Sequence, residues 1–267
     1  MRLGKCMRAA IAAVAMGVAA LATAGQAEAV TLNDIISRGK VRIGVLTGAP
    51  PMGMVDEKGN PTGYDVDVAN LLGSYLSLPV ELVPLTPPAR IPALQTGKVD
   101  FLVATLAPTG ERAKTVMFTQ PYSAFNMDII SGPGATFTKL ADLQGKRVAV
   151  NRGSSQETAL RKAAVPGLQI VVFEDDSTSA QAVIAGQADA VALPSTVGEA
   201  IIKQRPDAQL HVGFTFFQQG NSMATKLDDF ELRQWLNTSI YLMKISGDLD
   251  RIATKWTGRP MPVLPTF

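Results

Sequence analysis

The chain has 267 residues, 46% of them apolar, which is enough for one large domain or two modest lobes. Its single cysteine, Cys6, lies near the N-terminus, so disulfides, thiol catalysis and cysteine–metal sites are excluded from the rest of the chain. Of the 25 Lys and Arg and 23 Asp and Glu residues, three and one lie in the first 29 residues, which leaves 22 of each. This balance excludes a strongly basic nucleic-acid or membrane surface.

The first 29 residues have the pattern of a secretory signal peptide. A basic start is followed by the apolar, alanine-rich run 9–25 and by Ala27-Glu28-Ala29, which fits a cleavage site. The apolar run has 17 residues, which is short for a membrane span. Cys6 precedes the run, whereas a lipid-anchored cysteine lies at the cleavage site. We therefore expect an exported, soluble chain that is cleaved near Ala29.

The next part of the chain alternates between helices and strands. Apolar spacing predicts helices at 31–38, 65–76 and 91–96 and strands at 40–46, 80–84 and 99–105. The Gly- and Pro-rich segment 47–63 is expected to be a loop with a hairpin turn at 58–61. Beyond these elements Thr109 is a candidate N-cap of a further helix, which places Arg112 in its first turn. A cation is unfavourable there unless an anion lies beside the free N–H groups.

A second alternation begins at Lys146, and it repeats the first. The expected elements are strands at 147–151, 169–173 and 189–193 and helices at 154–164 and 180–185. Residues 93–104 and 182–193 both contain a helix, a glycine, an aspartate and an apolar strand. Alternating β/α units of this kind predict parallel strands with helices on both faces. The repeat therefore indicates two α/β lobes of similar design.

The C-terminal part returns to the first lobe. It contains a predicted strand at 221–225, a long helix at 228–246 and a short helix at 248–256. Apolar residues at helical spacing in the long helix, among them Phe230, Leu236 and Ile240, predict a core face. If this part packs on the first lobe, the chain crosses between the lobes twice, near 123–128 and near 217–221.

Three loops are candidates for binding, because ligands of open α/β sheets lie beyond the C-terminal ends of the strands. They are residues 47–52, 104–112 and 151–157. In the third, Ser154 and Glu157 fit a capping box, and Gly153 permits a tight turn whose amides suit an anion. The alternative is that these are ordinary caps and that Arg112 is a solvated side chain paired with Glu111. Two facing loops of the same kind favour a carboxylate site.

Signals for catalysis are few. The single histidine, His211, lies in an apolar context, and no set of His, Asp and Glu has metal-ligand spacing. The serines of 154–155 have no base near them in sequence, and no phosphate-binding glycine pattern is present. The sequence therefore favours binding over catalysis, and we expect no metal and no cofactor.

Several motifs together resemble the periplasmic solute-binding proteins of family 3, which are polar amino-acid receptors of ABC transporters. They are GYDVDVA (63–69), ERAKTVMFTQPY (111–122), LADLQGKRVAVNRG (140–153) and DRIATKW (250–256). The resemblance implies an α/β, two-lobed, periplasmic-binding-protein-like (type II) fold, in which two mixed-sheet lobes are joined by two hinge strands. We place lobe 1 at 30–125 and 219–267 and lobe 2 at 126–218, after the signal peptide at 1–29.

The resemblance also implies roles for individual residues. Arg112 corresponds to the arginine that pairs with the α-carboxylate of the ligand, and Ser155 to a hydroxyl residue that binds the same group. The other expected ligand-binding residues are Thr105, Asn151, Ser154, Ala107 and Met52.

The chain departs from the family pattern at the ammonium group of the ligand. The aspartates that usually hold this group are replaced by Leu46 and Pro194. Burying an unpaired ammonium costs several kcal/mol. Either another acid, such as Asp176 or Asp128, takes this role, or the ligand is not a standard α-amino acid.

We therefore expect a periplasmic substrate-binding protein of an ABC importer. It would bind an amino acid or related small carboxylate in the inter-lobe cleft and deliver it to the inner-membrane permease. We expect a monomer that binds no nucleic acid. The alternatives are a small-carboxylate dehydratase on the same scaffold and a ligand-sensing partner of a membrane receptor.

Overall fold

A computed structural model describes residues 31–262 of the chain, and the predicted signal peptide lies outside these residues. The strands are β1 (Val41–Leu46), β2 (Met54–Val55), β3 (Pro61–Thr62), β4 (Val80–Leu85), β5 (Phe101–Leu106), β6 (Val116–Ser131), β7 (Arg147–Asn151), β8 (Gln169–Phe173), β9 (Ala190–Pro194) and β10 (His211–Lys226). The α-helices are α2 (Leu32–Arg38), α3 (Tyr64–Leu76), α4 (Arg90–Gln95), α5 (Ser155–Ala163), α6 (Asp176–Ile184), α7 (Ser195–Gln204), α8 (Phe230–Ile245) and α9 (Asp248–Thr257). The 3-10 helices are η2 (Pro87–Ala89), η3 (Arg112–Lys114), η4 (Leu140–Leu143) and η5 (Pro206–Ala208).

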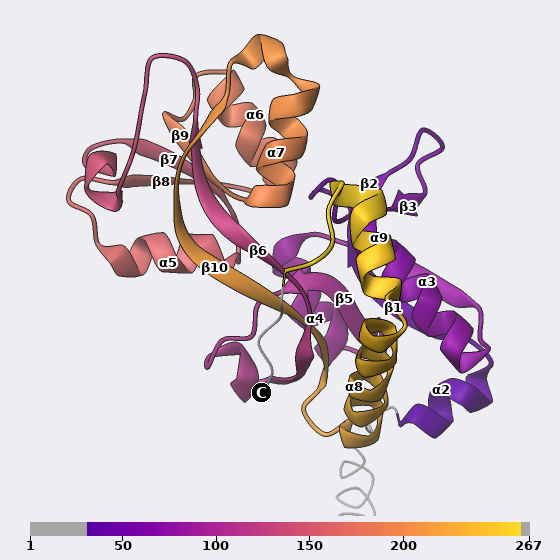
Figure 1. Ribbon diagram of the computed structural model, residues 1–267. Helices are drawn as coiled ribbons and strands as arrows, with labels where there is room; N and C mark the ends of the chain where they lie inside the picture. Colours follow the sequence, from indigo (N-terminus) through magenta and orange to yellow (C-terminus); the bar gives the residue numbers. More distant parts are fainter. Residues whose placement is uncertain (1–30, 263–267) are drawn as a thin grey trace, which may run out of the picture.

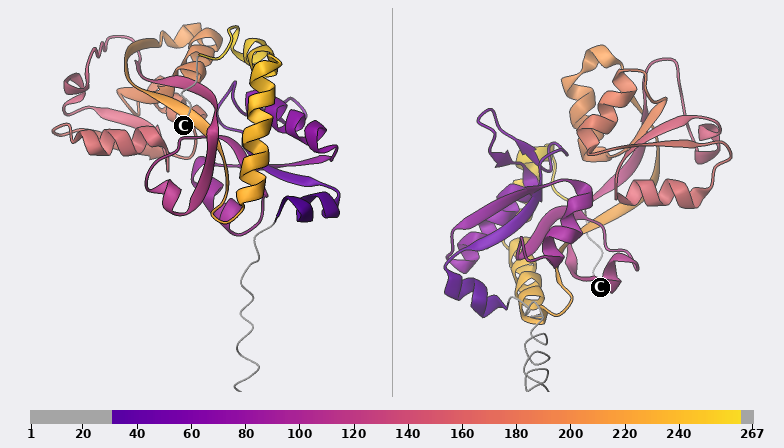
Figure 2. Two further views of the ribbon diagram at one scale, coloured as in Figure 1. Left: turned by 60° about the horizontal axis from the view of Figure 1, so that its bottom comes forward. Right: turned by 180° about the vertical axis from the view of Figure 1, so that it is seen from behind.

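Two long strands join the two lobes of the molecule (Figures 1 and 2). β6 and β10 have 16 residues each and pair antiparallel along their length. They lie at the centre of an eight-stranded sheet with the order β4-β1-β5-β10-β6-β9-β7-β8. β1 pairs parallel with β4 and β5 in one lobe, as β7 does with β8 and β9 in the other. The expected two-lobed mixed α/β fold is thus confirmed, although the paired crossing strands make the sheet continuous.

The predicted lobe limits fall within this crossing. Phe125 lies opposite Gln219, and Asn126 lies opposite Gln218, so the limits at 125/126 and 218/219 face each other across β6 and β10. The division itself stays a prediction. The C-terminal helices α8 and α9 pack against β6 and α3 of the first lobe, as expected.

Helix α8 has one buried and one exposed face. Leu236, Ile240 and Met243 are fully buried in the core of the first lobe. Phe230, which the spacing also assigned to the core, is 64% exposed because it lies in the first turn of the helix, at its end. Within residues 31–262, every helix is too short or too polar to span a bilayer.

The repeated aspartate has the same structural role in both lobes. The carboxylate of Asp100 accepts the backbone N–H of Arg42 at 2.7 Å, and that of Asp189 accepts the N–H of Arg147 at 2.8 Å. Each carboxylate also pairs with the guanidinium of the same arginine, at 2.8 and 2.7 Å. Asp100 directly precedes β5 and Asp189 directly precedes β9. Each aspartate therefore fixes the register between its own strand and the neighbouring parallel strand.

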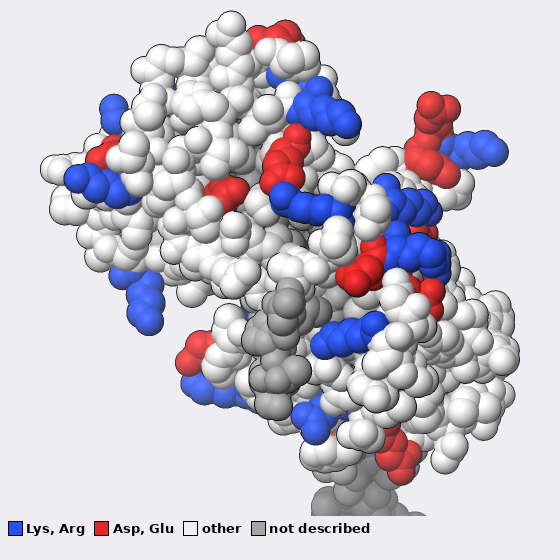
Figure 3. Space-filling model, viewed as in Figure 1, with Lys and Arg blue, Asp and Glu red and all other residues white. Residues whose placement is uncertain are grey.

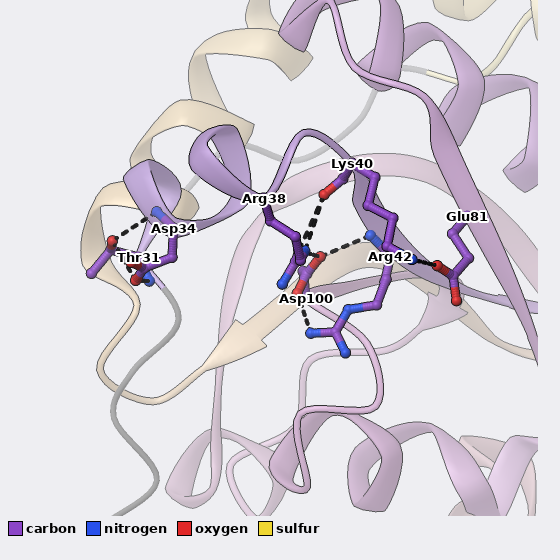
Figure 4. A network of polar contacts seen from close by, with 7 residues as sticks. All are labelled: Thr31, Asp34, Arg38, Lys40, Arg42, Glu81 and Asp100. Atoms are coloured by element: carbon purple, nitrogen blue, oxygen red, sulfur yellow. Dashed lines mark hydrogen bonds and ion pairs between the residues drawn. The ribbon is translucent and has the colours of Figure 1, made fainter.

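The two aspartates differ in burial, which predicts different contributions to stability. The Asp100 side chain is fully buried between Arg38 and Arg42 (Figure 4), whereas the Asp189 side chain is 32% exposed. Removing one partner of a buried ion pair costs about 3–5 kcal/mol, and exposed pairs contribute about 0–1 kcal/mol. We expect Asp100→Ala to lower the free energy of unfolding by about 3 kcal/mol and Asp189→Ala by about 1 kcal/mol. Urea unfolding measures both values, and equal losses would contradict this assignment.

Candidate ligand-binding site

A small cavity lies between the lobes, beside the C-terminal ends of β1, β5, β7 and β9. Its volume is about 20 Å³, which is room for about one water molecule. A cavity of this size does not hold an amino acid, and the lobes are in contact beside it, where Arg112 donates to the Gly153 carbonyl; we call this the closed form. Six of the seven predicted site residues line this cavity, namely Thr105, Ala107, Arg112, Asn151, Ser154 and Ser155.

Met52 is not part of the lining, and this expectation is corrected. Its side chain is 1% exposed and packs in the core of the first lobe. The loop folds back on the start of α3, where the carbonyls of Pro51 and Met52 accept the N–H groups of Tyr64 and Asp65. This pairing turns the apolar Met52 side chain inward. Gly48 of the same loop instead reaches the second lobe, because its carbonyl accepts the N–H of Ser177 at 3.1 Å.

The end of β5 has an unusual backbone at Thr105. Its φ of 44° lies in the left-handed region, which is rare for a β-branched residue and costs about 1–2 kcal/mol. The Thr105 N–H donates to the Tyr122 hydroxyl at 3.1 Å. The backbone bend lies where β5 meets the cavity, and Ala107 follows two residues later.

Arg112 joins the two lobes directly. Its Nη1 donates to the carbonyl of Ala107 and its Nη2 to the carbonyl of Gly153, both at 2.8 Å. Thr109 Oγ1 accepts the Arg112 N–H at 3.2 Å, as expected of a cap. However, only the three-residue 3-10 helix η3 follows, so the expected α-helix does not form. The cation of Arg112 is therefore held by carbonyl groups rather than placed against a helix dipole.

The loop after β7 forms a helix cap whose amides are partly used. Ser154 Oγ accepts the N–H of Glu157 at 3.1 Å. The Glu157 carboxylate accepts the N–H of Gly153 at 2.8 Å, so the predicted capping box is only half formed. Ser155 lies on the hinge side, where its hydroxyl donates to Gln219 of β10. The N–H of Gly153, one of the amides expected to bind an anion, is thus already paired with the Glu157 carboxylate.

Asp176 is the one of the two candidate acids, Asp176 and Asp128, that lies at the cavity. It lines the cavity at the start of α6, and its side chain is buried. Burial raises its pKa to about 7, although the positive charge of Arg90 opposes the rise. Gln156 Nε2 donates to Asn151 Oδ1 at 2.7 Å and lies 3.4 Å from Asp176 Oδ1. The other candidate, Asp128, accepts from Thr215 at 2.5 Å and is outside the lining.

Arg90 is a second cation at the cavity that the sequence analysis did not identify. It is buried, and its Nε donates to the carbonyl of Pro87 at 2.9 Å while Nη1 donates to that of Ala104 at 3.0 Å. Burial and the charge of Arg112 lower its pKa to about 9. Gln156 and Gln219 were also missed. The signal that could have identified Arg90 is its position as the one charged residue in the otherwise apolar segment 87–91.

The charged groups at the cavity are the guanidinium groups of Arg90 and Arg112 and the carboxyl group of Asp176, whose pKa is raised. This arrangement suits a ligand with at least one carboxylate. Within residues 31–262, no group of three or more His, Cys, Asp and Glu side chains could hold a metal ion. On the outer surface, acidic and basic side chains are interspersed over the face that Figure 3 shows.

Comparison with known proteins shows the family of the chain. Residues 41–259 match the model of the bacterial extracellular solute-binding proteins, family 3. The L-cystine-binding protein TcyJ of Escherichia coli (strain K12) is 26% identical over 250 residues, which are 93% of this chain and 93% of that protein.

Two solved structures share the fold. An ancestral arginine-binding protein bound to arginine is 34% identical, with a TM-score of 0.79, covering 82% of this chain and 98% of that one. An ancestral amino acid-binding protein that is a precursor of cyclohexadienyl dehydratase is 32% identical, with a TM-score of 0.78, covering 84% and 98%. The relatives are binding proteins, and the ligands in their names differ. The chain belongs to the bacterial extracellular solute-binding proteins, family 3.

Proposed function

We propose that the chain is the periplasmic substrate-binding protein of an ABC importer, which binds an amino acid or related small carboxylate between its lobes and delivers it to the inner-membrane permease. The observation that carries the proposal is the joint presence of Arg112, Ser155 and Asp176 at one cavity. Each charge-assisted hydrogen bond to a carboxylate contributes about 1.5–3 kcal/mol. Asp176 would supply the negative charge for the ammonium group of the ligand, in place of the two family aspartates that are replaced by Leu46 and Pro194.

The ligand stabilises the closed form by bonding to both lobes. In the closed structure Arg112 bonds to Gly153 and Ser155 bonds to Gln219 across the cavity. A carboxylate that enters the open cleft takes over these donors and returns bonds to both sides when the lobes close. Closure is then a population shift driven by contacts that exist only in the closed form. The permease distinguishes the two forms by shape.

Location and assembly are part of the same proposal. The relatives include one named as an ABC transporter binding protein and others named as periplasmic proteins, and the first 29 residues have the pattern of a signal peptide cleaved near Ala29. The assembly in this proposal is a monomer. The balanced charge supports a small-molecule ligand rather than a nucleic acid.

The charge of the cavity predicts the preferred ligand. Arg90 and Arg112 contribute two positive charges, and Asp176 contributes at most one negative charge. L-Glutamate and L-aspartate complement this set, since each carries two carboxylates and one ammonium. We expect either to bind about tenfold or more tightly than L-glutamine or L-arginine, because an unmatched buried charge is costly. A thermal-shift panel tests this, since a ligand at 100 times its Kd stabilises the fold by about 2.7 kcal/mol. Tighter binding of L-arginine would contradict it.

A second candidate function is a dehydratase acting on a cyclic carboxylate. Two observations favour this candidate. Burial raises the pKa of Asp176 to about 7, which suits a general acid. In addition, one structural relative is a precursor of cyclohexadienyl dehydratase. Incubation of the pure protein with cyclohexadienyl carboxylates tests for product. Product that disappears in Asp176→Asn would establish the enzyme, and its absence leaves the binding protein.

A further inference from the structure

Two buried polar side chains lie behind the cavity, within the core of the first lobe. Asp65 of α3 and Tyr122 of β6 are both 0% exposed. The Tyr122 hydroxyl donates to Asp65 Oδ1 at 2.7 Å and accepts the N–H of Thr105 at 3.1 Å. Asp65 Oδ2 has no hydrogen-bond partner among residues 31–262. Because buried polar groups are costly unless paired, this arrangement is unfavourable for stability alone.

The group that this pair contacts is the strained backbone of the binding site. Thr105 has a left-handed φ of 44°, and its N–H is the one that Tyr122 accepts. On the other side, Arg90 Nη1 donates to the carbonyls of Ala104 and Thr105 at 3.0 and 3.4 Å. The backbone at Thr105 is therefore bonded on one side to the Tyr122 hydroxyl, through its N–H, and on the other side to the Arg90 guanidinium, through the neighbouring carbonyls.

We propose that Asp65 and Tyr122 are positioning residues for the ligand site. Through the Thr105 N–H they hold the end of β5 in its left-handed conformation, and this backbone aligns the guanidinium of Arg90 at the cavity wall. Neither residue lines the cavity. This inference rests on the proposed function, because its second readout is the binding of an amino acid.

The ionisation of Asp65 is consistent with this role. Burial raises its pKa to about 8, against the favourable hydrogen bond from Tyr122 and the charge of Arg90. A neutral carboxyl accepts the Tyr122 hydroxyl without adding a charge beside Arg90. The other titratable group near Asp65 is the Tyr64 hydroxyl, which donates to the Tyr122 carbonyl at 3.0 Å. Asp65→Asn keeps a neutral acceptor, and Asp65→Ala removes it.

The test is a double-mutant cycle between Tyr122→Phe and Thr105→Gly, measured by calorimetry with L-glutamate. Glycine adopts the left-handed conformation without steric cost, so it does not need the Tyr122 hydroxyl. We expect Tyr122→Phe to weaken binding about tenfold when Thr105 is present and less than about threefold in the Thr105→Gly background. Asp65→Asn is expected to retain affinity, and Asp65→Ala to lose it as Tyr122→Phe does.

A second readout does not depend on the ligand. The Nε–H signal of Arg90 in a proton–nitrogen NMR spectrum reports the alignment of its guanidinium. We expect Tyr122→Phe to shift or broaden this signal in the chain with Thr105 but not in the Thr105→Gly background. Tyr64→Phe is the matched control, since it removes a buried tyrosine hydroxyl that does not contact Thr105.

The outcomes separate this inference from the proposed function. Equal effects of Tyr122→Phe in both backgrounds, or no effect in either, would overturn the positioning role. So would a loss of affinity on Tyr64→Phe as large as that on Tyr122→Phe in variants that unfold at similar temperatures. If L-glutamate, L-glutamine and L-arginine all fail to bind the unaltered chain, the proposed function is at fault, and the Arg90 signal still decides the positioning role.

Discussion

Arg112→Ala is expected to lower the affinity for an amino-acid ligand about 100-fold or more while leaving the chain folded. The guanidinium lies at the cavity, and among residues 31–262 its acceptors are the carbonyl groups of Ala107 and Gly153, so a carboxylate can replace either one. Loss of two charge-assisted hydrogen bonds at about 1.5–3 kcal/mol each corresponds to a factor of about 10² to 10⁴ in Kd. Isothermal titration calorimetry measures the change, and thermal unfolding confirms the fold.

Arg152→Ala is the matched control for this variant. Arg152 lies in the adjoining loop of the second lobe, its side chain is 56% exposed, and its pairing with Glu174 is long at 3.5 Å. Exposed pairs contribute about 0–1 kcal/mol, so its removal should leave affinity within about threefold. Arg112→Lys should bind with intermediate affinity, because lysine keeps the charge but not the two-pronged geometry. Affinity of Arg112→Ala within threefold of the unaltered chain would remove Arg112 from the site.

Asp176→Asn should weaken binding of L-glutamate about 100-fold, by leaving the ammonium without a counter-charge in a closed cavity. The corresponding 2-oxo acid, which has no ammonium, should bind the variant at least as well as it binds the unaltered chain. Asp128→Asn is the matched control, since Asp128 is also a buried carboxyl but bonds to Thr215 away from the cavity. Equal losses for L-glutamate and the oxo acid would show that Asp176 does not recognise the ammonium.

The same carboxyl predicts how affinity depends on pH. Burial raises the pKa of Asp176 to about 7 in the ligand-free chain, and a bound ammonium lowers it. Below pH 7 the carboxyl must lose a proton to bind, so the affinity for L-glutamate should fall up to about tenfold per pH unit. The dependence should disappear in Asp176→Asn. Titrations between about pH 5.5 and pH 7 measure it.

The raised pKa of Asp176 also predicts how the stability of the ligand-free chain depends on pH, and the direction is opposite to that of the affinity. Because the pKa of Asp176 is higher in the folded chain than the ordinary aspartate value of 3.8, the folded state binds the proton more tightly. This carboxyl therefore contributes less to stability as pH rises from 3.8 to about 7. A ligand-free Asp176→Asn chain should lack this decline.

The fold could be predicted from the sequence because its signals are local. The repeated Gly-x-x-Asp before an apolar strand, at Asp100 and at Asp189, marks the same strand pairing in both lobes. Gly39 ends α2 in the left-handed conformation, directly after the helix predicted at 31–38. Such features depend on residues close in sequence, so periodicity and capping were enough to find them.

The incomplete predictions involve contacts between distant segments. Arg90 reaches the cavity because its guanidinium bonds to the end of β5, and Gln219 because β10 crosses beside α5. Met52 turns inward because its loop pairs with the start of α3. The resemblance identified Arg112 by its motif, but the reason first given, a helix dipole, fails because η3 has only three residues. In these cases the position of the residue in the folded chain, rather than its type, decides whether it reaches the cavity.

A crystal structure of the chain with L-glutamate tests the central claim most directly. We predict that the α-carboxylate lies within hydrogen-bond distance of Arg112 and Ser155, that the ammonium contacts Asp176, and that the second carboxylate faces Arg90. A ligand bound between the lobes with its ammonium held only by backbone carbonyls, or with neither carboxylate on an arginine, would contradict the proposed site.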